Sequence, residues 1–460
     1  MKQSRPNIIL INCDDLGYGD LGCYGSSVNK TPAVDRLAAE GVRFTDFYMG
    51  SPVCSPSRGA MLTGCYPRRI GFGSFAGQWV LFPGQAQGLN PEETTIAGLL
   101  KQAGYATMLV GKWHCGDQQE FLPTRHGFDR YYGLPFSNDM GRQASRPGRP
   151  PRRQWPPLPL LADEDVIEEQ PDQTSLTERY VEQCVRFMRE KRRQPFFLYF
   201  AHMHVHLPHY TPDRFLRQSE NGAYGAAVEC IDWAMAVILD ELERLGLKDN
   251  TIVMFTSDNG SRARGEGGSN GPLRGTKGTT WEGGMRVPCI VRWPGRVPAG
   301  SICSELTSAM DFLPTIAHIT DQSLPDNTID GRNVIPLWLG QAEAASPHGA
   351  FFYYHMDNLE AVRSGPWKLH LRKQDEIVSA LYNLTDDMGE TNDVLADHPD
   401  VASRLQKLID ACRTELGDAA VRAPGTGCRV VGEVANPVPL TQYDPDHPYI
   451  VAMYDKYDAG

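Results

Sequence analysis

The chain has 460 residues, of which 41% are hydrophobic and 22% charged, and this composition excludes collagen-like, coiled-coil and wholly disordered proteins. The length fits one large α/β domain or two domains. Lys and Arg number 45 against 56 Asp and Glu, a formal net charge of −11. We therefore expect neither a nucleic-acid nor a membrane partner, and an anionic ligand must be bound by locally placed cations.

The N-terminus carries no recognisable targeting segment. No apolar run is expected to approach the roughly 18 residues that span a bilayer, and no signal-peptide core precedes the first strand. The expected location is the cytoplasm if this N-terminus is native, and the periplasm or the exterior if a leader has been removed. The 11 cysteines are odd in number and irregularly spaced, which argues against a disulfide framework.

Short apolar runs alternate with helical segments through the first two-thirds of the chain. This alternation is typical of βαβ units, which build a mostly parallel sheet with helices on both faces. Strands are expected at residues 7–12, 107–110, 196–201, 251–256 and 289–293. Start and stop signals place helices between Thr31 and Gly41, between Thr94 or Thr95 and Gly104, and over residues 226–245.

Two later parts of the chain depart from this alternation of strands and helices. Residues 141–175 are rich in proline and arginine and predict a long loop or insertion. Alternating segments at 351–355, 367–371 and 380–384, followed by a helical pattern at 401–416, predict a small antiparallel sheet with a packed helix. We therefore expect an α/β domain at residues 1–345 and a C-terminal subdomain at 346–460.

Charged or imidazole side chains follow four of the expected strands. In open parallel sheets, ligands bind beyond the carboxyl ends of the strands, so groups far apart in sequence can meet in one crevice. The residues concerned are Asp14, Asp15, Lys112, His114, His202, His204, His206, Asp258 and Asn259.

Part of this set has the composition of a cation site. Carboxylates of Asp14, Asp15 and Asp258 with the amide oxygen of Asn259 are the ligands that Ca²⁺ or Mg²⁺ prefers. The alternative is a hydrogen-bond network without metal, because Asp and Asn are also common in loops and caps. A further alternative is Zn²⁺ on three histidines, which would share one face if residues 202–206 were extended.

The segment Cys54-Ser55-Pro56-Ser57-Arg58 is the most specific pattern in the chain. With Ser55 as a cap and Pro56 in the first turn, Cys54 would lie at a helix N-terminus, where the dipole favours negative charge. Arg58, one turn later, would add a positive charge on the same face. These residues alone leave two interpretations open, an activated thiolate nucleophile or an ordinary helix start.

Several segments resemble the type I, formylglycine-dependent sulfatases, in particular the branch of arylsulfatase A and N-acetylgalactosamine-6-sulfatase. The segment 54–58 with Leu62-Thr63-Gly64 is similar to the C-x-P-x-R motif and its downstream L-T-G, and Gly111-Lys112-Trp113-His114 is similar to the second signature. The matches run from residue 7 to about residue 290 and continue at 361–369 and 381–384. Further matching segments are 14–17, 206–208, 257–260, 275–278 and 281–284.

This resemblance implies an alkaline-phosphatase-like fold, a mixed and mostly parallel sheet sandwiched by helices, with a smaller C-terminal antiparallel sheet. It implies hydrolysis of sulfate monoesters, with a sulfated carbohydrate as the expected substrate. Cys54 would be converted to formylglycine by a formylglycine-generating enzyme. Calcium, or alternatively magnesium, would be held by Asp14, Asp15, Cys54, Asp258 and Asn259.

By the same similarity, each remaining residue has a role at the sulfate. Arg58 would steady the hydroxyl of the formylglycine hydrate, while Lys112 and Lys277 would bind sulfate oxygens. His206, with Lys277, would protonate the leaving alcohol, and His114 would take the proton from the second hydroxyl so that sulfate departs.

Two further residues are expected near the substrate. Ser137 matches a sulfate-contacting serine of this branch, and His204 is expected either to contact substrate or to support the site by a hydrogen bond. Candidates for contact with a sugar ring are Trp79, Trp113, Trp281, Tyr354 and His355.

Two other functions remain as alternatives. Phosphate or phosphonate esters share the tetrahedral geometry of sulfate esters, and a second set of metal ligands, which the sequence does not show, would favour them. A binding protein that never receives the modification is the other alternative. The intact set of polar residues argues against it, namely Cys54, Arg58, Lys112, His114, His206 and Lys277.

Overall fold

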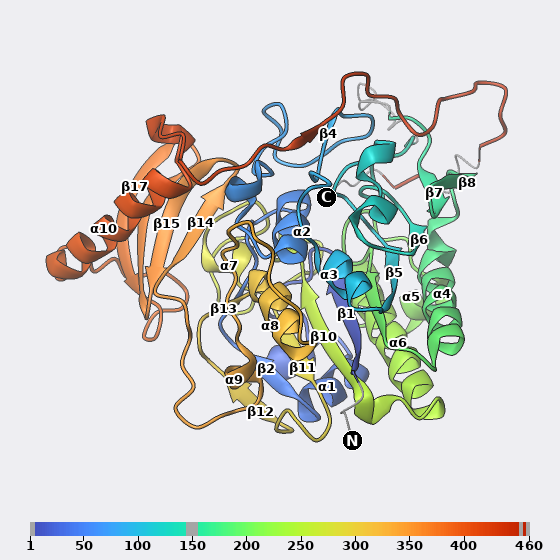
Figure 1. The fold of residues 1–460 in the computed structure, drawn as a ribbon, viewed down its shortest axis with the longest axis horizontal. Helices are drawn as coiled ribbons and strands as arrows, with labels where there is room; N and C mark the ends of the chain where they lie inside the picture. Colours follow the sequence, from blue (N-terminus) through green and yellow to red (C-terminus); the bar gives the residue numbers. More distant parts are fainter. Residues whose placement is uncertain (1–4, 144–154, 450–453, 457–460) are drawn as a thin grey trace.

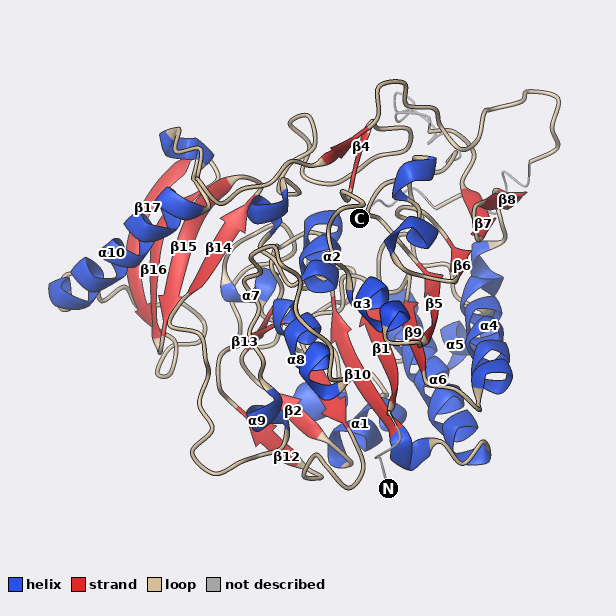
Figure 2. Ribbon diagram, viewed as in Figure 1, coloured by secondary structure: helices blue, strands red, loops and turns tan. Residues whose placement is uncertain are grey.

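The computed structural model describes residues 5–143, 155–449 and 454–456 (Figure 1). A large twisted sheet runs through the molecule with helices on both faces, and a smaller sheet stands beside it (Figure 2). This arrangement agrees with the mixed α/β architecture expected from the sequence.

The large sheet contains ten strands. Their bounds are β1 (Asn7–Cys13), β2 (Val42–Phe44), β5 (Ala106–Gly111), β6 (Arg130–Gly133), β7 (Pro159–Ala162), β8 (Asp165–Glu169), β9 (Phe196–Ala201), β10 (Thr251–Ser257), β11 (Cys289–Arg292) and β12 (Ser301–Cys303). Their order is β12-β2-β11-β10-β1-β9-β5-β6-β7-β8. The five strands from β10 to β6 are parallel, and antiparallel pairs flank them on both sides.

Strand β1 lies at the centre of this sheet and is buried along its whole length. Ile8 and Leu10 pack into the core on one face, and Ile9 and Ile11 pack into the core on the other. Because successive side chains of a strand point to opposite faces, a strand covered on both sides needs a continuous apolar run. This explains why the strand is apparent in the sequence.

Helices cover both faces of the large sheet, and the last α-helix of the described chain packs on the smaller sheet instead. Their bounds are α1 (Pro32–Ala39), α2 (Cys54–Thr63), α3 (Ile96–Gln102), α4 (Leu176–Lys191), α5 (Asp213–Gln218), α6 (Gly222–Arg244), α7 (Glu282–Met285), α8 (Phe312–Ile319), α9 (Ile335–Trp338) and α10 (Pro399–Glu415). Helices α1, α4 and α6 contribute to the core on one face, whereas α2, α3 and α8 contribute to the core on the other.

Helix α6 corrects one expectation from the sequence. By length and composition it is the one helix in the described part of the chain that could cross a membrane, although no such apolar run was expected. In the structure, 72% of its most apolar window is buried, and its apolar side chains pack with α1 and α4. Those side chains therefore serve the core of this fold.

The smaller sheet is antiparallel and carries one helix. It consists of β14 (Phe351–His355), β15 (Asn358–Ser364), β16 (Trp367–Lys373) and β17 (Glu376–Asn383), in that order, with α10 packed against it. Two short pairs complete the strands, β3 (Phe47–Tyr48) with β13 (Thr307–Ser308) and β4 (Gln87–Gly88) with β18 (Gly432–Glu433). The expected boundary at residues 345 and 346 stays a prediction.

The tail of the chain does not remain with the smaller sheet. After α10 it returns across the α/β part, where β18 pairs with β4 (Figure 1). The Tyr454 hydroxyl donates a hydrogen bond to the Pro171 carbonyl at 2.8 Å. The described end of the chain therefore contacts the α/β part, although the sequence grouped it with the C-terminal subdomain.

The segment 141–175 also differs from the expected loop. Residues 144–154 lie outside the described residues, but β7 and β8 form a hairpin that extends the sheet beyond β6. Leu160 and Leu161 are fully buried there. The many prolines around these leucines hid the strand pattern, because proline disfavours a strand interior but is accepted at a sheet edge.

Candidate active site

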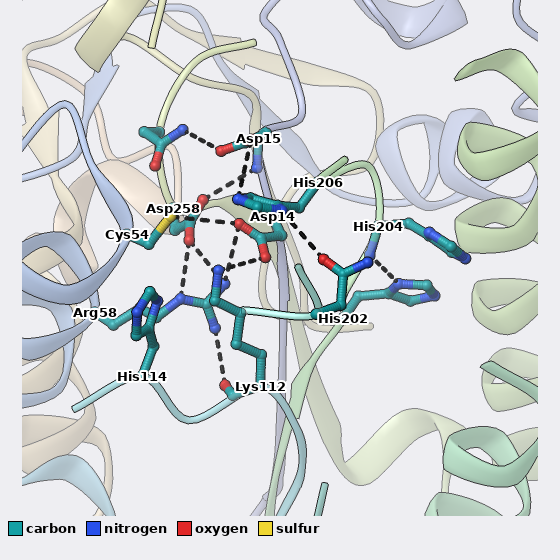
Figure 3. Close-up of polar contacts among 12 residues, drawn as sticks. Asp14, Asp15, Cys54, Arg58, Lys112, His114, His202, His204, His206 and Asp258 are labelled. Carbon is teal, nitrogen blue, oxygen red and sulfur yellow. Dashed lines mark hydrogen bonds and ion pairs between the residues drawn. The ribbon is translucent and has the colours of Figure 1, made fainter. Parts of the chain in front are cut away.

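The carboxyl ends of four neighbouring parallel strands bring the predicted polar residues together (Figure 3). Asp14, Lys112 and Asp258 come directly after β1, β5 and β10, His206 lies in the segment after β9, and Lys277 lies in the longer loop after β10. The N-terminus of α2 faces the same point. The side chains that converge are Asp14, Asp15, Cys54, Arg58, Lys112, His206, Asp258 and Lys277.

Cys54 is the first residue of α2, and its Sγ lies 3.6 Å from Asp14 Oδ1. Val53 occupies the N-cap position, so the expected cap at Ser55 is wrong. The Ser55 hydroxyl instead accepts a hydrogen bond from the Leu81 N–H at 3.1 Å. Burial raises the pKa of the Cys54 thiol well above its ordinary value, although Lys112 lowers it in part. This environment does not support a reactive thiolate.

Arg58 is fully buried and connects three parts of the site. Its Nη2 lies 2.7 Å from Asp258 Oδ2, and its Nε donates to the same oxygen at 2.9 Å. Its Nη1 donates to the Lys112 carbonyl at 2.9 Å. Burial raises the pKa of Asp258 even though Arg58 opposes this shift. The guanidinium therefore holds the end of β10 against the end of β5.

Two lysines pair with the carboxylates that follow β1. Lys112 Nζ lies 2.6 Å from Asp14 Oδ2, and Lys277 Nζ lies 2.9 Å from Asp15 Oδ2. Burial acts to lower the pKa of each lysine, but the adjacent carboxylates raise both values above the ordinary one. Both ammonium groups therefore stay charged at neutral pH.

The acidic cluster beside Cys54 has the donor set of a hard-cation site. Ligand atoms of Asp14, Asp15, Cys54 and Asp258 all lie within 4.8 Å of one another. Asn259 Nδ2 donates to Asp15 Oδ1 at 2.8 Å, but the buried Oδ1 of Asn259 has no hydrogen-bond partner among the described residues. A network without metal leaves this oxygen unsatisfied, whereas a bound cation would use it.

The two histidines at the site have opposite tautomers. His114 Nε2 lies 2.9 Å from the Leu81 carbonyl, so Nε2 carries the hydrogen and the buried Nδ1 keeps a lone pair. His206 Nδ1 lies 2.7 Å from the Leu207 carbonyl and 3.1 Å from Asn138 Oδ1, so its lone pair is on Nε2. Burial and the charge of Lys277 lower the pKa of His206 to about 4. Its ring is therefore neutral near pH 7.

His202 and His204 do not reach this cluster (Figure 3). Their rings contact one another with centroids 5.2 Å apart, and both side chains are fully buried. Among the described residues, neither belongs to a group of potential metal ligands, whereas His206 does. The described residues therefore form no three-histidine zinc site, and His204 is not among the residues that line the cavity.

A cavity of about 480 Å³ opens over the cluster. Cys54, His114, Ser137, His206 and Lys277 line it, which places five predicted site residues on one surface. Of the aromatic candidates, Trp79 lines the cavity, whereas Trp113 and Tyr354 are buried in the core. Sequence reasoning missed the other lining residues, which are Val53, Val80, Phe82, Asp139, Met140, Gln143, Trp155, Arg262 and Arg264.

Comparison with known proteins places the chain in a family. The family model described as Sulfatase matches residues 6–322, and the model described as N-sulphoglucosamine sulphohydrolase, C-terminal, matches residues 276–415. The chain belongs to the sulfatase family.

Relatives of this sulfatase cover most of its length. Arylsulfatase A of Homo sapiens is 38% identical over 459 residues, which covers 90% of this chain and 89% of the relative. N-acetylgalactosamine-6-sulfatase of Homo sapiens is 41% identical over 379 residues, which covers 79% and 71%. The crystal structure of Ps i-CgsB in complex with k-i-k-neocarrahexaose has a TM-score of 0.77, with 29% identity and coverage of 89% and 92%. The sulfatase is thus a sulfuric ester hydrolase with an alkaline-phosphatase-like fold, as predicted.

Proposed function

We propose that this sulfatase hydrolyses sulfate esters of carbohydrates, and that its nucleophile is formylglycine made from Cys54 by a formylglycine-generating enzyme. The observation that carries the proposal is the place of Cys54, which begins α2, lines the cavity and lies 3.6 Å from Asp14. A carbohydrate is supported by the name of the N-acetylgalactosamine-6-sulfatase relative and by the neocarrahexaose in complex with Ps i-CgsB.

The proposed chemistry needs two groups that the chain itself does not encode. The hydrated aldehyde of formylglycine would offer one hydroxyl to attack sulfur and a second whose deprotonation lets sulfate leave. Calcium would be held by Asp14, Asp15, Asp258 and Asn259 and would supply positive charge next to the attacked sulfate. The cluster fits such an ion because its donors are all oxygens apart from residue 54.

The cations of the chain bind and orient the sulfate. Lys277 lines the cavity, and Lys112 lies behind Cys54 with its ammonium fixed by Asp14. Arg58, fully buried and one turn after residue 54 in α2, stabilises negative charge on the side chain of residue 54. We assign Ser137 a hydrogen bond to a sulfate oxygen, since it lines the same cavity.

Two proton transfers follow from the tautomers at the site. His114 Nδ1 has a lone pair and lines the cavity, so it can accept the proton of the second hydroxyl. Lys277 is charged and can donate to the leaving oxygen. His206, neutral in the free enzyme, can share this role once an anionic substrate enters, because a nearby negative charge favours the imidazolium.

Sulfate release tests this proposal. Ion chromatography would measure sulfate freed from sulfated monosaccharides, sulfated oligosaccharides and aryl sulfates, using protein co-expressed with a formylglycine-generating enzyme. Release from a sugar that disappears in Cys54→Ala supports the proposal. Faster hydrolysis of phosphate esters, measured as released phosphate, or of phosphonate monoesters, measured as released alcohol, would contradict it. Within the described residues, both groups of potential metal ligands share Asp14 and Cys54, so they form one site, which favours sulfate over a two-metal phosphatase.

A further inference from the structure

The loop after β10 brings two arginines to the cavity. Asp258 and Asn259 directly follow this strand at the acidic cluster, and Arg262 and Arg264 then line the same cavity as Cys54 and Lys277. Ser261 comes directly before Arg262, and its carbonyl accepts a hydrogen bond from the Lys277 N–H at 3.0 Å. The arginines therefore belong to the loop that also supports the sulfate-binding lysine.

The turn that carries these arginines is anchored on both sides. The Ser261 hydroxyl accepts a hydrogen bond from the Ala263 N–H at 3.3 Å, and the Glu266 carboxylate accepts one from the Arg264 N–H at 2.7 Å. Ala263 has a φ of 43°, in the left-handed region that non-glycine residues rarely adopt. Hydrogen bonds of two successive N–H groups, those of Ala263 and Arg264, show that this turn has a defined conformation.

The Arg264 side chain differs from the cations at the sulfate end of the cavity. Each cation beside Cys54 faces a carboxylate, in the pairs Arg58 with Asp258, Lys112 with Asp14, and Lys277 with Asp15. Among the described residues, the exposed Arg264 side chain has no ion-pair partner. Its charge is therefore available to a ligand in the cavity.

We propose that Arg264, with Arg262 beside it in the cavity wall, forms a second anion subsite, so that preferred substrates carry a further acidic group besides the sulfate that is cleaved. A carboxylate or a second sulfate on the same sugar or on its neighbour would fit, because a guanidinium binds both through paired hydrogen bonds. The proposal rests on the proposed function, since the cleaved sulfate must lie at residue 54.

The other walls of the cavity restrict where the acidic group lies. Phe82 and Trp155 stack with ring centroids 5.2 Å apart and an interplanar angle of 9°, and with Trp79 they offer apolar faces to a sugar ring. Asp139 also lines the cavity, and its Oδ1 is buried without a hydrogen-bond partner among the described residues. A sugar hydroxyl suits Asp139, whereas an acidic group would be repelled there and attracted to the arginines.

Substrate pairs that differ by one acidic group test the subsite. Suitable pairs are N-acetylgalactosamine 6-sulfate with its 4,6-disulfate, and 4-carbamoylphenyl sulfate with 4-carboxyphenyl sulfate. The readout is the ratio of kcat/KM for the acidic member to that for its partner, which a general loss of activity does not change. We expect a ratio of about ten or more for at least one pair. The ratio falls toward one in Arg262→Gln/Arg264→Gln, whereas Arg193→Gln, an exposed arginine outside the cavity, keeps it.

Binding separates failure of the subsite from failure of the proposed function. Isothermal titration calorimetry on the Cys54→Ala protein would measure the affinity of both members of each pair without turnover. Tighter binding of the acidic member, lost in the double arginine variant, supports the subsite even if no sugar sulfate is hydrolysed. Equal affinity for both members of every pair, or a preference that survives the double substitution, would overturn it even if sulfate release is normal.

Discussion

The Arg58 guanidinium and the Asp258 carboxylate form an ion pair without exposed surface, with Nη2 2.7 Å from Oδ2. The pair joins the first turns of α2, which begins with Cys54, to the end of β10. Removal of only one partner of a buried ion pair strongly destabilises a protein, because the remaining charge stays buried without a compensating partner.

Replacement of Arg58 by methionine should therefore destabilise the protein as well as inactivate it. We expect a loss of about 3–5 kcal/mol in the free energy of unfolding, measured by urea denaturation in the presence of a chelator so that no cation replaces the guanidinium. Arg193→Met, at an exposed position, should lie within about 0.5 kcal/mol of the parent. An Arg58→Met protein as stable as the parent would refute a structural role for the pair.

Removal of divalent cations should lower the melting temperature. Three carboxylates share a site with ligand atoms within 4.8 Å of one another, and a cation that binds only the folded protein stabilises it by mass action. We expect EGTA to lower Tm and calcium to restore it, with magnesium less effective. Asp15→Asn should have a weaker response to both additions. An unchanged Tm after chelation, with no metal detected by elemental analysis, would favour a metal-free hydrogen-bond network.

Loss of the proton donor should depend on the leaving group. Lys277→Ala should lower kcat by about 10²–10⁴-fold for sugar or alkyl sulfates and much less for 4-nitrophenyl sulfate, whose leaving group needs no proton. Ser137→Ala, which removes a proposed sulfate contact, should lower both rates by similar factors. Equal losses for both substrates in Lys277→Ala would contradict its role as a donor and leave only sulfate binding.

The loop that carries Lys277 is fixed from the smaller sheet. Lys368 Nζ on β16 lies 2.9 Å from Glu282 Oε1, the Thr280 carbonyl and Glu390 Oε1, with no exposed surface. We expect Lys368→Met to lower the free energy of unfolding by about 3–5 kcal/mol, because it leaves buried carboxylates unpaired. It should also lower kcat more for sugar sulfates than for 4-nitrophenyl sulfate, as expected for Lys277→Ala but to a smaller extent. Destabilisation without that difference would limit Lys368 to a structural role.

Lys373 lies five residues after Lys368 on β16. Its replacement serves as a control for Lys368→Met and tests how stability depends on pH. Burial and the charge of Lys368 lower the pKa of Lys373 to about 6. Between about pH 6 and pH 10 the unfolded chain therefore binds more protons at this lysine than the folded protein, so its contribution to stability rises with pH by less than about 1.4 kcal/mol per unit. Lys373→Met should be nearly neutral or stabilising at pH 7 and should reduce this slope. An identical slope in the variant would refute the shift.

Much of the site could be predicted because its residues follow apolar strands. Asp14 and Asp258 come directly after β1 and β10, which neighbour one another in parallel register, so the rule for carboxyl ends of strands was sufficient. His204 shows the limit of that rule, because residues 202–206 do not continue β9 and the ring turns into the core.

The walls of the cavity could not be predicted from the sequence. Trp79, Trp155 and Arg264 come from three separate loops, and no periodicity indicates which loops meet. The hairpin of β7 and β8 was hidden by surrounding prolines, although Leu160 and Leu161 are apolar. The protonation of Cys54 also depends on burial, which the local sequence does not reveal.

The central claim is that catalysis requires conversion of Cys54, and one measurement tests it directly. Preparations made with increasing co-expression of a formylglycine-generating enzyme would be analysed by mass spectrometry for the fraction of the Cys54 peptide that is converted, and by ion chromatography for the rate of sulfate release from a substrate shown to be cleaved. We expect a rate proportional to the converted fraction, with zero rate at zero conversion. Sulfate release by protein with unconverted Cys54, or by Cys54→Ala, would contradict it.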